Sequence, residues 1–259
     1  MWKIKYYYND KDFKLIHWDC FIELKKIEDN SIDLIFADPP YFLSNDWITC
    51  SGWKMVSVNK GGWDKVQTLQ EKHQFNKTWI KECYRVLKDN WTIRISWTLH
   101  NIYSIGMALE ENNFKILNNI TRGKTNPPPN LACKTFTHST ETVLWAKKNL
   151  KKVKYTFNYD LMKEKNWWKQ MKDIWLNDLW MTSLTRPSEK KEWRHPTQKP
   201  LELLERIILA SSNEWDLVLD PFSWSWTTWI AAVNLNRRYI WIEKEKEYLD
   251  LSIRRFLSL

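Results

Sequence analysis

The sequence contains very little glycine. Glycine accounts for 5 of 259 residues, whereas average proteins contain roughly 7%. Glycine supplies the positive φ angles and close backbone approach that anion- and cofactor-binding turns require. As written, the chain therefore lacks a glycine-rich binding loop. Tryptophan, by contrast, occurs 19 times.

Paired cysteines and clustered histidines are also absent. The four cysteines (Cys20, Cys50, Cys83 and Cys133) lie far apart and form no CxxC pair, which argues against a zinc ribbon or a disulfide framework. None follows a proline, which argues against the covalent cysteine chemistry used to methylate C5 of cytosine. The five histidines form no metal-binding motif. We therefore expect reduced thiols and no metal.

Long apolar runs are missing. No stretch approaches the roughly 18 apolar residues that a membrane span requires, and the first ten residues contain no apolar signal-peptide core. The chain is 43% hydrophobic and 27% charged, which suffices for a sizeable core with an ordinary polar surface. These features predict a cytoplasmic protein that does not associate with membranes.

Positive charge is concentrated in one segment. Residues 122–195 contain 16 basic and 7 acidic residues, and this excess equals the net charge of the whole chain, +9. A basic segment attached to a neutral core favours a polyanionic partner, because phosphate contacts supply most non-specific affinity for nucleic acids. A solvated lysine-rich surface is the alternative interpretation.

Many tryptophans stand where the local sequence calls for glycine. The segment from Asp220 to Trp229 turns from a strand into a helix, yet it carries indoles at positions 224, 226 and 229. Polar turn settings also hold Trp18, Trp91 and Trp215. We hypothesise that these residues are glycines whose UGA codons were read as tryptophan, because decay of a dead gene would scatter many kinds of substitution. Trp63, Trp79, Trp145 and Trp175 lie in apolar settings and fit genuine tryptophan.

Strand and helix patterns alternate along the chain. Predicted strands cover residues 31–37, 92–96, 141–146, 217–220 and 238–243, and predicted helices cover 75–88, 102–111, 200–211, 227–234 and 245–256. The alternation predicts a single α/β domain over residues 1–259 with a mainly parallel sheet. Residues 42–74 are expected to form a flexible loop, and 122–195 to include a basic insertion that recognises the target.

The strongest chemical signal is the motif Asp38-Pro39-Pro40-Tyr41 at the end of a predicted strand. An exocyclic amine of a base is a poor nucleophile because its lone pair is delocalised into the ring. The Asp38 carboxylate and the rigidly held Pro39 carbonyl could accept the amine hydrogens, and Tyr41 could stack on an extruded base. A strand followed by an incidental di-proline turn is the structural alternative.

A second signal lies near the carboxyl end of the chain. With glycine at 224 and 226, residues 218–228 would form a strand, a glycine-rich turn and the start of a helix, an arrangement that binds anionic groups. Glu243 ends the next strand, where acids hold ribose hydroxyls in dinucleotide folds. Together with Asp38, these features predict a nucleoside cofactor at the carboxyl ends of the strands.

The combined motifs resemble the β-class DNA amino-methyltransferases. The chain is especially similar to the second, DpnA-type, methyltransferases of DpnII-like GATC restriction–modification systems. The likeness runs from about residue 15 to 256 and includes Phe36–Ser44, Leu99–Tyr103, Lys124–Pro127, Phe136–Thr142 and His195–Pro200. It implies a Rossmann-like methyltransferase fold with helices on both sheet faces and a permuted motif order, in which the catalytic motif precedes the cofactor motif.

The resemblance also implies ligands and partners. The expected cofactor is S-adenosyl-L-methionine, and the expected substrate is adenine N6 in GATC, in double-stranded or single-stranded DNA. A homodimer and a cognate restriction endonuclease are further partners that the family suggests. The expected cofactor-binding residues are Asp19, Cys20, Asp38, Thr197, Gln198, Lys199, Asp220, Phe222, Ser223, Trp224, Ser225, Trp226, Thr227, Thr228 and Glu243.

Two alternatives remain open at the level of sequence. The same amine chemistry would serve N4 of cytosine or an RNA base, although aspartate at position 38 favours adenine. Literal indoles at 224 and 226 would fill the methionine end of the pocket, and the chain would then be an inactive DNA-binding paralogue. In addition, Arg122 stands where the family usually carries an aromatic residue.

Overall fold

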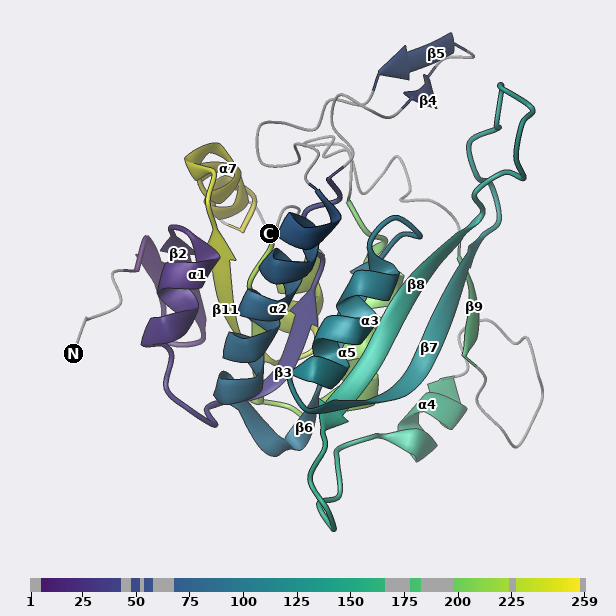
Figure 1. Ribbon diagram of the computed structural model, residues 1–259. Helices are drawn as coiled ribbons and strands as arrows, with labels where there is room; N and C mark the ends of the chain where they lie inside the picture. The colour runs from purple at the N-terminus through teal and green to yellow at the C-terminus, as the bar shows by residue number, and fades with distance from the viewer. Residues whose placement is uncertain are drawn as a thin grey trace.

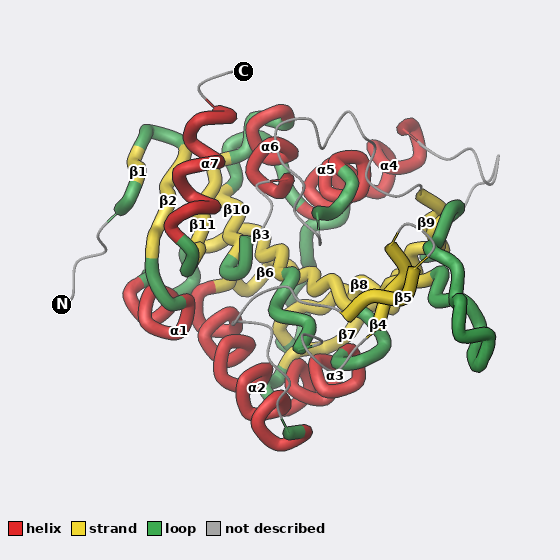
Figure 2. Tube along the Cα trace, turned by 90° about the horizontal axis from the view of Figure 1, so that it is seen from above, coloured by secondary structure: helices red, strands yellow, loops and turns green. Residues whose placement is uncertain are grey.

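One large sheet organises the molecule. The computed structural model describes residues 6–42, 48–51, 54–57, 68–165, 178–182, 198–223 and 227–256. Within these ranges the sheet has nine strands in the order β1-β2-β11-β10-β3-β6-β8-β7-β9, and β4 and β5 form a separate hairpin. Helices α1, α2 and α3 lie on one side of the sheet, and α4, α5, α6 and α7 on the other (Figure 2). The domain is therefore layered as helix, sheet and helix.

The strands and helices have the following bounds. The strands are β1 Tyr8–Asn9, β2 Phe13–His17, β3 Ile32–Ala37, β4 Ile48–Ser51, β5 Lys54–Ser57, β6 Leu87–Trp97, β7 Phe114–Lys124, β8 Thr140–Lys148, β9 Leu179–Thr182, β10 Leu217–Asp220 and β11 Arg238–Glu243. The helices are α1 Cys20–Glu23, α2 Leu69–Val86, α3 Ile102–Glu111, α4 Tyr159–Lys165, α5 Leu201–Ser211, α6 Thr227–Asn234 and α7 Lys246–Phe256.

The centre of the sheet is parallel, as the alternation of strand and helix patterns predicted. Strand β3 pairs in parallel with β10 and β6, and β11 pairs in parallel with β10 and β2. All six residues of β3 are buried, which is expected of a parallel strand with both faces covered. The carboxyl ends of β3, β10 and β11 consequently meet at one edge.

The far side of the sheet reverses direction. Strand β8 is antiparallel to both β6 and β7, and β9 pairs in parallel with β7. The connection between β7 and β8, residues 125–139, therefore leaves the sheet at the same edge as the carboxyl end of β3 and projects well beyond it (Figure 1). Its Phe136 is 97% exposed.

Most predicted elements are present, with shifted ends and several additions. The predicted helix at 75–88 begins earlier, at Leu69, where Thr68 and Glu71 form a capping box. Strands β2, β7 and β9 and helix α4 were not predicted. The segment 122–195 begins inside the sheet, because Arg122, Gly123 and Lys124 pair with β8 and β9. The predicted loop 42–74 contains the β4–β5 hairpin.

Two apolar clusters fill the space on either side of the sheet. One includes Trp79, Ile80 and Cys83 of α2, and the other includes Leu203, Leu204 and Ile207 of α5. The regular spacing of these side chains along their helices explains why both helices bury one face. None of the helices in the described ranges combines the length and apolar character needed to span a lipid bilayer.

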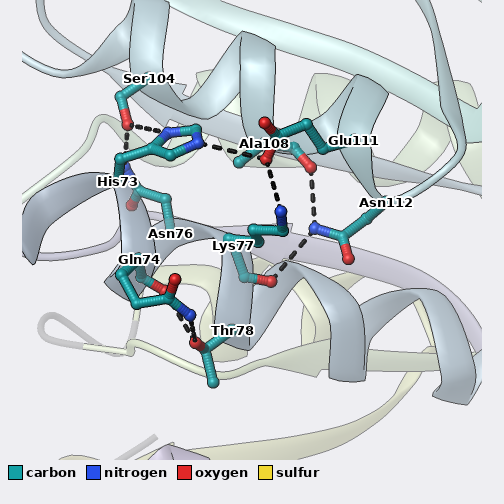
Figure 3. Close-up of polar contacts among 9 residues, drawn as sticks. All are labelled: His73, Gln74, Asn76, Lys77, Thr78, Ser104, Ala108, Glu111 and Asn112. Carbon is teal, nitrogen blue, oxygen red and sulfur yellow. Dashed lines mark hydrogen bonds and ion pairs between the residues drawn. The ribbon is translucent and has the colours of Figure 1, made fainter. Parts of the chain in front are cut away.

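A polar cluster joins α2 to α3 (Figure 3). The ring nitrogens of His73 lie 3.1 Å from Ser104 Oγ and 3.2 Å from Glu111 Oε2. Lys77 Nζ lies 3.1 Å from the same Glu111 oxygen, and the Asn112 side chain donates to the Lys77 carbonyl. These contacts fix the register of the two helices that support the carboxyl edge beside β6.

The backbone of Trp215 adopts a conformation that suits glycine. Trp215 has φ of 67°, and the Asp216 amide donates to the Asn213 carbonyl at 3.2 Å. A positive φ at the third position of such a turn is the type II geometry, which favours glycine. The side chain is 60% exposed, so little packing offsets the backbone strain.

Replacing Trp215 by glycine should stabilise the protein. A left-handed conformation costs a residue with a side chain about 1–2 kcal/mol, so Trp215→Gly should raise the free energy of unfolding by about 1 kcal/mol. Trp79→Ala is the matched control, because the Trp79 indole is fully buried and its loss should cost about 3–5 kcal/mol. Denaturant unfolding measures both values. A destabilised Trp215→Gly variant would contradict the glycine assignment at this turn.

Candidate active site

Asp38 lies directly beyond the carboxyl end of β3. Its carboxylate is 6% exposed and accepts a hydrogen bond from Tyr41 Oη at 2.8 Å. Lys199, which precedes α5, places its ammonium 2.7 Å from both carboxylate oxygens. The pKa of Asp38 is raised, because burial outweighs the charge of Lys199 and the hydrogen bonds from Lys199 and Tyr41, which lower it. Buried hydrogen bonds from Tyr41 and Lys199 thus hold Asp38 in place.

Asp220 lies at the matching position on β10. Its carboxylate accepts hydrogen bonds from the Phe222 amide at 3.0 Å and from Thr228 Oγ1 at 2.8 Å. Burial raises the pKa of Asp220 to about 7, against these hydrogen bonds. Because Thr228 belongs to the first turn of α6, Asp220 joins the strand end to the helix start across the turn predicted to bind the cofactor.

Glu243 ends β11, beside the segment that carries Asp19. Glu243 is 3% exposed, and burial raises the pKa of its carboxyl to about 8, although the Glu245 and Lys244 amides lower it. The Trp18 amide donates to the Glu243 carbonyl at 3.1 Å. Asp19 accepts from the Phe21 amide and caps α1. The sheet thus brings Asp19 and Glu243 to neighbouring strand ends.

A small cavity connects the two predicted motifs. Asp38 and Lys199 line it together with Asp220 and Thr228; the complete lining within the described residues is Phe36, Asp38, Lys199, Leu204, Asp220, Phe222, Ser223 and Thr228. These side chains come from β3, β10, α5, α6 and the segment before α5. Residues separated by about 180 positions in the sequence therefore share one cavity.

Trp97 is a site residue that the sequence did not single out. Its indole is fully buried and lies against Tyr41, with ring centroids 4.8 Å apart. The ring nitrogen of Trp97 is buried without a hydrogen-bond partner in the described structure. Trp97 ends β6 in a polar Ser-Trp-Thr setting like those of the other suspect tryptophans, which is the signal that could have identified it. A base stacked on Tyr41 would compete with this indole.

A charged network lies next to the motif on β7 and β8. Glu141 Oε2 lies 2.6 Å from Arg122 Nη1, and Lys124 Nζ lies 2.8 Å from Glu141 Oε1. Arg122 also donates to Thr182 on β9. Burial would raise the pKa of Glu141, but the charges of Lys199, Arg122 and Lys124 lower it to about 2. The sequence marked Arg122 as unusual for the family but did not point to Glu141.

The remaining predicted site residues divide into two groups. Pro39, Pro40, Cys20, Gln198, Ser223 and Thr227 lie at this edge of the sheet or beside it, with Ser223 Oγ 3.1 Å from Tyr239 Oη. Burial raises the pKa of the Cys20 thiol well above its usual range, so Cys20 is not a nucleophile. Thr197, Trp224, Ser225 and Trp226 lie outside the described residues, as does His195.

The indoles packed beside the cofactor turn differ from that of Trp215. Trp229 of α6 is 2% exposed and lies between Phe13 and Trp241, with ring centroids 6.1 and 6.0 Å away. The packing therefore accommodates tryptophan at 229, and the backbone strain found at Trp215 has no counterpart here: Trp229 is not among the residues with positive φ.

Comparison with known proteins identifies the family. Residues 32–254 match the N6/N4 methyltransferase family described as DNA methylase. The chain belongs to this family. The resemblance inferred from the Asp38 and Asp220 motifs is confirmed. The match spans both motifs and the whole segment between them.

Several members of the DNA methylase family are similar over almost the whole chain. The chain is 57% identical to the type II methyltransferase M2.DpnII of Streptococcus pneumoniae over 97% of this chain and 92% of that protein. It is 52% identical to M2.MboI of Moraxella bovis, over 98% and 92%. M.HinfI of Haemophilus influenzae is 40% identical, over 97% of this chain and 70% of that protein.

Solved structures confirm the expected fold. The complex of M1.HpyAVI with SAM is 29% identical, with a TM-score of 0.68 over 94% of this chain and 98% of that chain. The PvuII cytosine-N4 DNA methyltransferase superposes with a TM-score of 0.75, over 97% and 89%, at 19% identity. The likeness to the second protein shows the fold alone. The Rossmann-like arrangement with helices on both faces is thus shared across the family.

The burial of Glu243 predicts a pH dependence of nucleoside binding. With a pKa of about 8, the carboxyl carries a proton at neutral pH, whereas the ionised form accepts hydroxyl hydrogens better. In a variant with glycine in place of Trp97, Trp224 and Trp226, affinity for S-adenosylhomocysteine should therefore rise as pH increases from about 7 to 9, with release of a proton on binding. Isothermal titration calorimetry in buffers of different ionisation enthalpy measures both effects. The same rise in Glu243→Gln would assign the proton to another group.

Proposed function

We propose that this DNA methylase transfers a methyl group from S-adenosyl-L-methionine to N6 of adenine in DNA. The observation that carries the proposal is the buried Asp38, which follows the carboxyl end of β3 and lines one cavity together with Asp220 and Thr228. Asp38, which can accept hydrogens from an amine, thus lies next to Asp220 and Thr228, which border the expected nucleoside site. The SAM complex of the related M1.HpyAVI supports the choice of donor.

The chemistry is a direct displacement. Asp38 and the Pro39 carbonyl accept the two amine hydrogens, which lets the nitrogen lone pair leave the ring system and point at the methyl group. The C–N bond forms as the C–S bond breaks, and the electron pair of that bond stays on sulfur. The amine then loses a proton that methylation has already made acidic, so no strong base is required. Tyr41 provides the ring on which the extruded base stacks.

The residues at the strand ends fit the methyl donor. When bound, S-adenosyl-L-methionine supplies an electrophilic methyl group. Glu243 is a buried carboxyl at the end of β11, where it can accept hydrogen bonds from the ribose hydroxyls of the donor. Asp19 follows the neighbouring strand, β2, and is proposed to lie near the adenine of the donor. Asp220, Phe222 and Thr228 shape the turn before α6, whose amide groups suit the methionine carboxylate.

The similar proteins narrow the target and the context. M2.DpnII and M2.MboI are type II methyltransferases of the same restriction–modification class, and Asp38 favours adenine over cytosine. We therefore propose GATC as the site, on double-stranded and also single-stranded DNA, with residues 122–195 contributing basic target contacts. A homodimer, a cognate restriction endonuclease and a cytoplasmic location complete the proposal.

The tryptophans in the cofactor turn belong to the same proposal. We infer that positions 224 and 226 are glycine in the active protein, and that position 97, whose indole covers Tyr41, is glycine as well. Trp215 supports this inference independently, because its φ of 67° suits glycine. UGA codons at these positions would agree with it, whereas UGG codons would remove it.

Removing the carboxylate of Asp38 should separate chemistry from binding. In a parent protein with glycine at positions 97, 224 and 226, Asp38→Ala should lower methyl transfer by about 10²–10⁴-fold, because the amine loses its principal acceptor. Binding of S-adenosylhomocysteine should change little, since the neutral thioether makes no demand on the carboxylate. Transfer is measured with labelled donor, and binding by calorimetry. Equal loss of both would count against the assigned role.

Restoring small residues should restore the site. The triple variant Trp97→Gly, Trp224→Gly and Trp226→Gly should bind the donor and methylate DNA, whereas the chain with all three indoles should do neither. Trp145→Gly is the control, because Trp145 packs against Arg94 and does not line the cavity that holds Asp38 and Asp220, so the space that its loss leaves should not restore donor binding. Failure of the triple variant to bind the donor would overturn the proposed function.

The target base and sequence can be tested directly in the triple variant. DNA methylated by this protein should resist a nuclease that GATC methylation blocks, and its nucleosides should contain N6-methyl-2′-deoxyadenosine by mass spectrometry. N4-methyl-2′-deoxycytidine in the digest would instead identify cytosine as the target. Methylated DNA that remains sensitive to that nuclease would assign another sequence.

A further inference from the structure

The ion pair between Lys199 and Asp38 has no place in the displacement itself. Lys199 Nζ lies 2.7 Å from each Asp38 oxygen and 2.5 Å from Tyr41 Oη. Both members of the pair are buried, with side-chain exposures of 6% and 8%. The ammonium also lies over the Tyr41 ring, 5.2 Å from its centroid. A single cation thus contacts both the hydrogen acceptor and the base-stacking ring.

Acidic groups surround this pair from several elements. Glu141 of β8 and Asp220 of β10 both interact electrostatically with Asp38. Glu141 is neutralised by Arg122 and Lys124. Burial and the negative charge of Glu141 raise the pKa of Asp38 and so disfavour its ionised form. The Lys199 ammonium lowers this pKa and favours the ionised form. A protonated Asp38 would offer a hydrogen where the reaction requires an acceptor.

We propose that Lys199 is a positioning residue that acts through Asp38: its ammonium keeps the carboxylate ionised and oriented, and its charge weakens binding of the cationic methyl donor relative to the neutral product. The first part rests on the proposed function, because it takes Asp38 as the acceptor of the amine hydrogens. The second part concerns donor binding and needs no DNA.

The geometry of methyl transfer brings the positively charged sulfonium of the donor close to the Lys199 ammonium. The amine nitrogen must lie about 2.9 Å from its carboxylate acceptor and about 3–3.5 Å from the methyl carbon, and the sulfonium is one bond further. Since Lys199 contacts the same carboxylate, the two positive charges lie in one buried site, where Asp38 contacts the ammonium directly and Glu141 interacts with it electrostatically. Like charges at such range in a poorly solvated site repel. Transfer of the methyl group leaves an uncharged thioether and removes this repulsion.

The first test is the pH dependence of a single turnover on DNA. Lys199→Met should shift the acidic limb of the rate profile to higher pH by about one unit, because Asp38 loses its cation and its pKa rises. Lys199→Arg keeps the charge and should leave the limb near its original position. Counting labelled methyl groups in DNA makes the result independent of which base is modified, so a wrong target base would not affect it. A limb that is unchanged in Lys199→Met would overturn this part of the proposal.

The second test compares two ligands by calorimetry in the absence of DNA. Relative to S-adenosylhomocysteine, S-adenosylmethionine should bind about tenfold more tightly to Lys199→Met than to the parent protein. Asp38→Asn should show the opposite change, because Lys199 then faces the sulfonium without the carboxylate that it contacts directly. Both comparisons use the triple glycine variant as the parent. An identical ratio of affinities in all proteins would show that the ammonium has no effect on the donor.

A matched pair of variants guards against misfolding. If Lys199→Met leaves an isolated buried carboxylate and does not fold, the double variant Asp38→Asn with Lys199→Met removes both charges and avoids this penalty. The preference of the double variant for S-adenosylmethionine over S-adenosylhomocysteine should exceed that of Asp38→Asn alone by about tenfold, the factor expected for removal of the Lys199 charge. An equal ratio in the single and double variants would reject the proposal. Failure to bind either ligand would instead concern the proposed function.

Discussion

The buried contact between the Asp38 carboxylate and the Lys199 ammonium is the constraint around which the site is arranged. A lone carboxylate at this depth would be costly, since burial penalises charge. The contact joins the end of β3 to the segment before α5, which lie 161 positions apart in the sequence. The fold thus provides the counter-ion that lets an acid remain an acceptor.

Much of the central fold follows from the sequence. The all-buried β3 and the apolar β10 read as strands because both faces are covered, and helices α3, α5 and α6 have the predicted cores. The Asp38 and Asp220 motifs were placed at strand ends, and the structure brings both to one cavity. Local patterns succeed here because each element buries a regular face against the sheet.

The elements that were not predicted depend on distant partners. Strand β7 contains Asn118 and Asn119 and has no clear alternation; its pairing with β8 and the short β9 supplies its stability. Glu141 reads as an ordinary polar residue at the start of a strand, and only the approach of Arg122 and Lys124 makes it a buried charge. Lys199 was predicted to bind the cofactor, and its contact with Asp38 was not foreseen. Side-chain partners across the sheet cannot be read from local spacing.

The antiparallel return of β8 has a consequence for how such proteins diverge. Because β8 runs opposite to β6 and β7, the 125–139 connection with its exposed Phe136 emerges at the catalytic edge while its two ends stay anchored in the sheet. New sequences can therefore replace this connection without disturbing the ladder beneath it. Exchange of this connection would leave the strand pairings and the contact between Asp38 and Lys199 as they are.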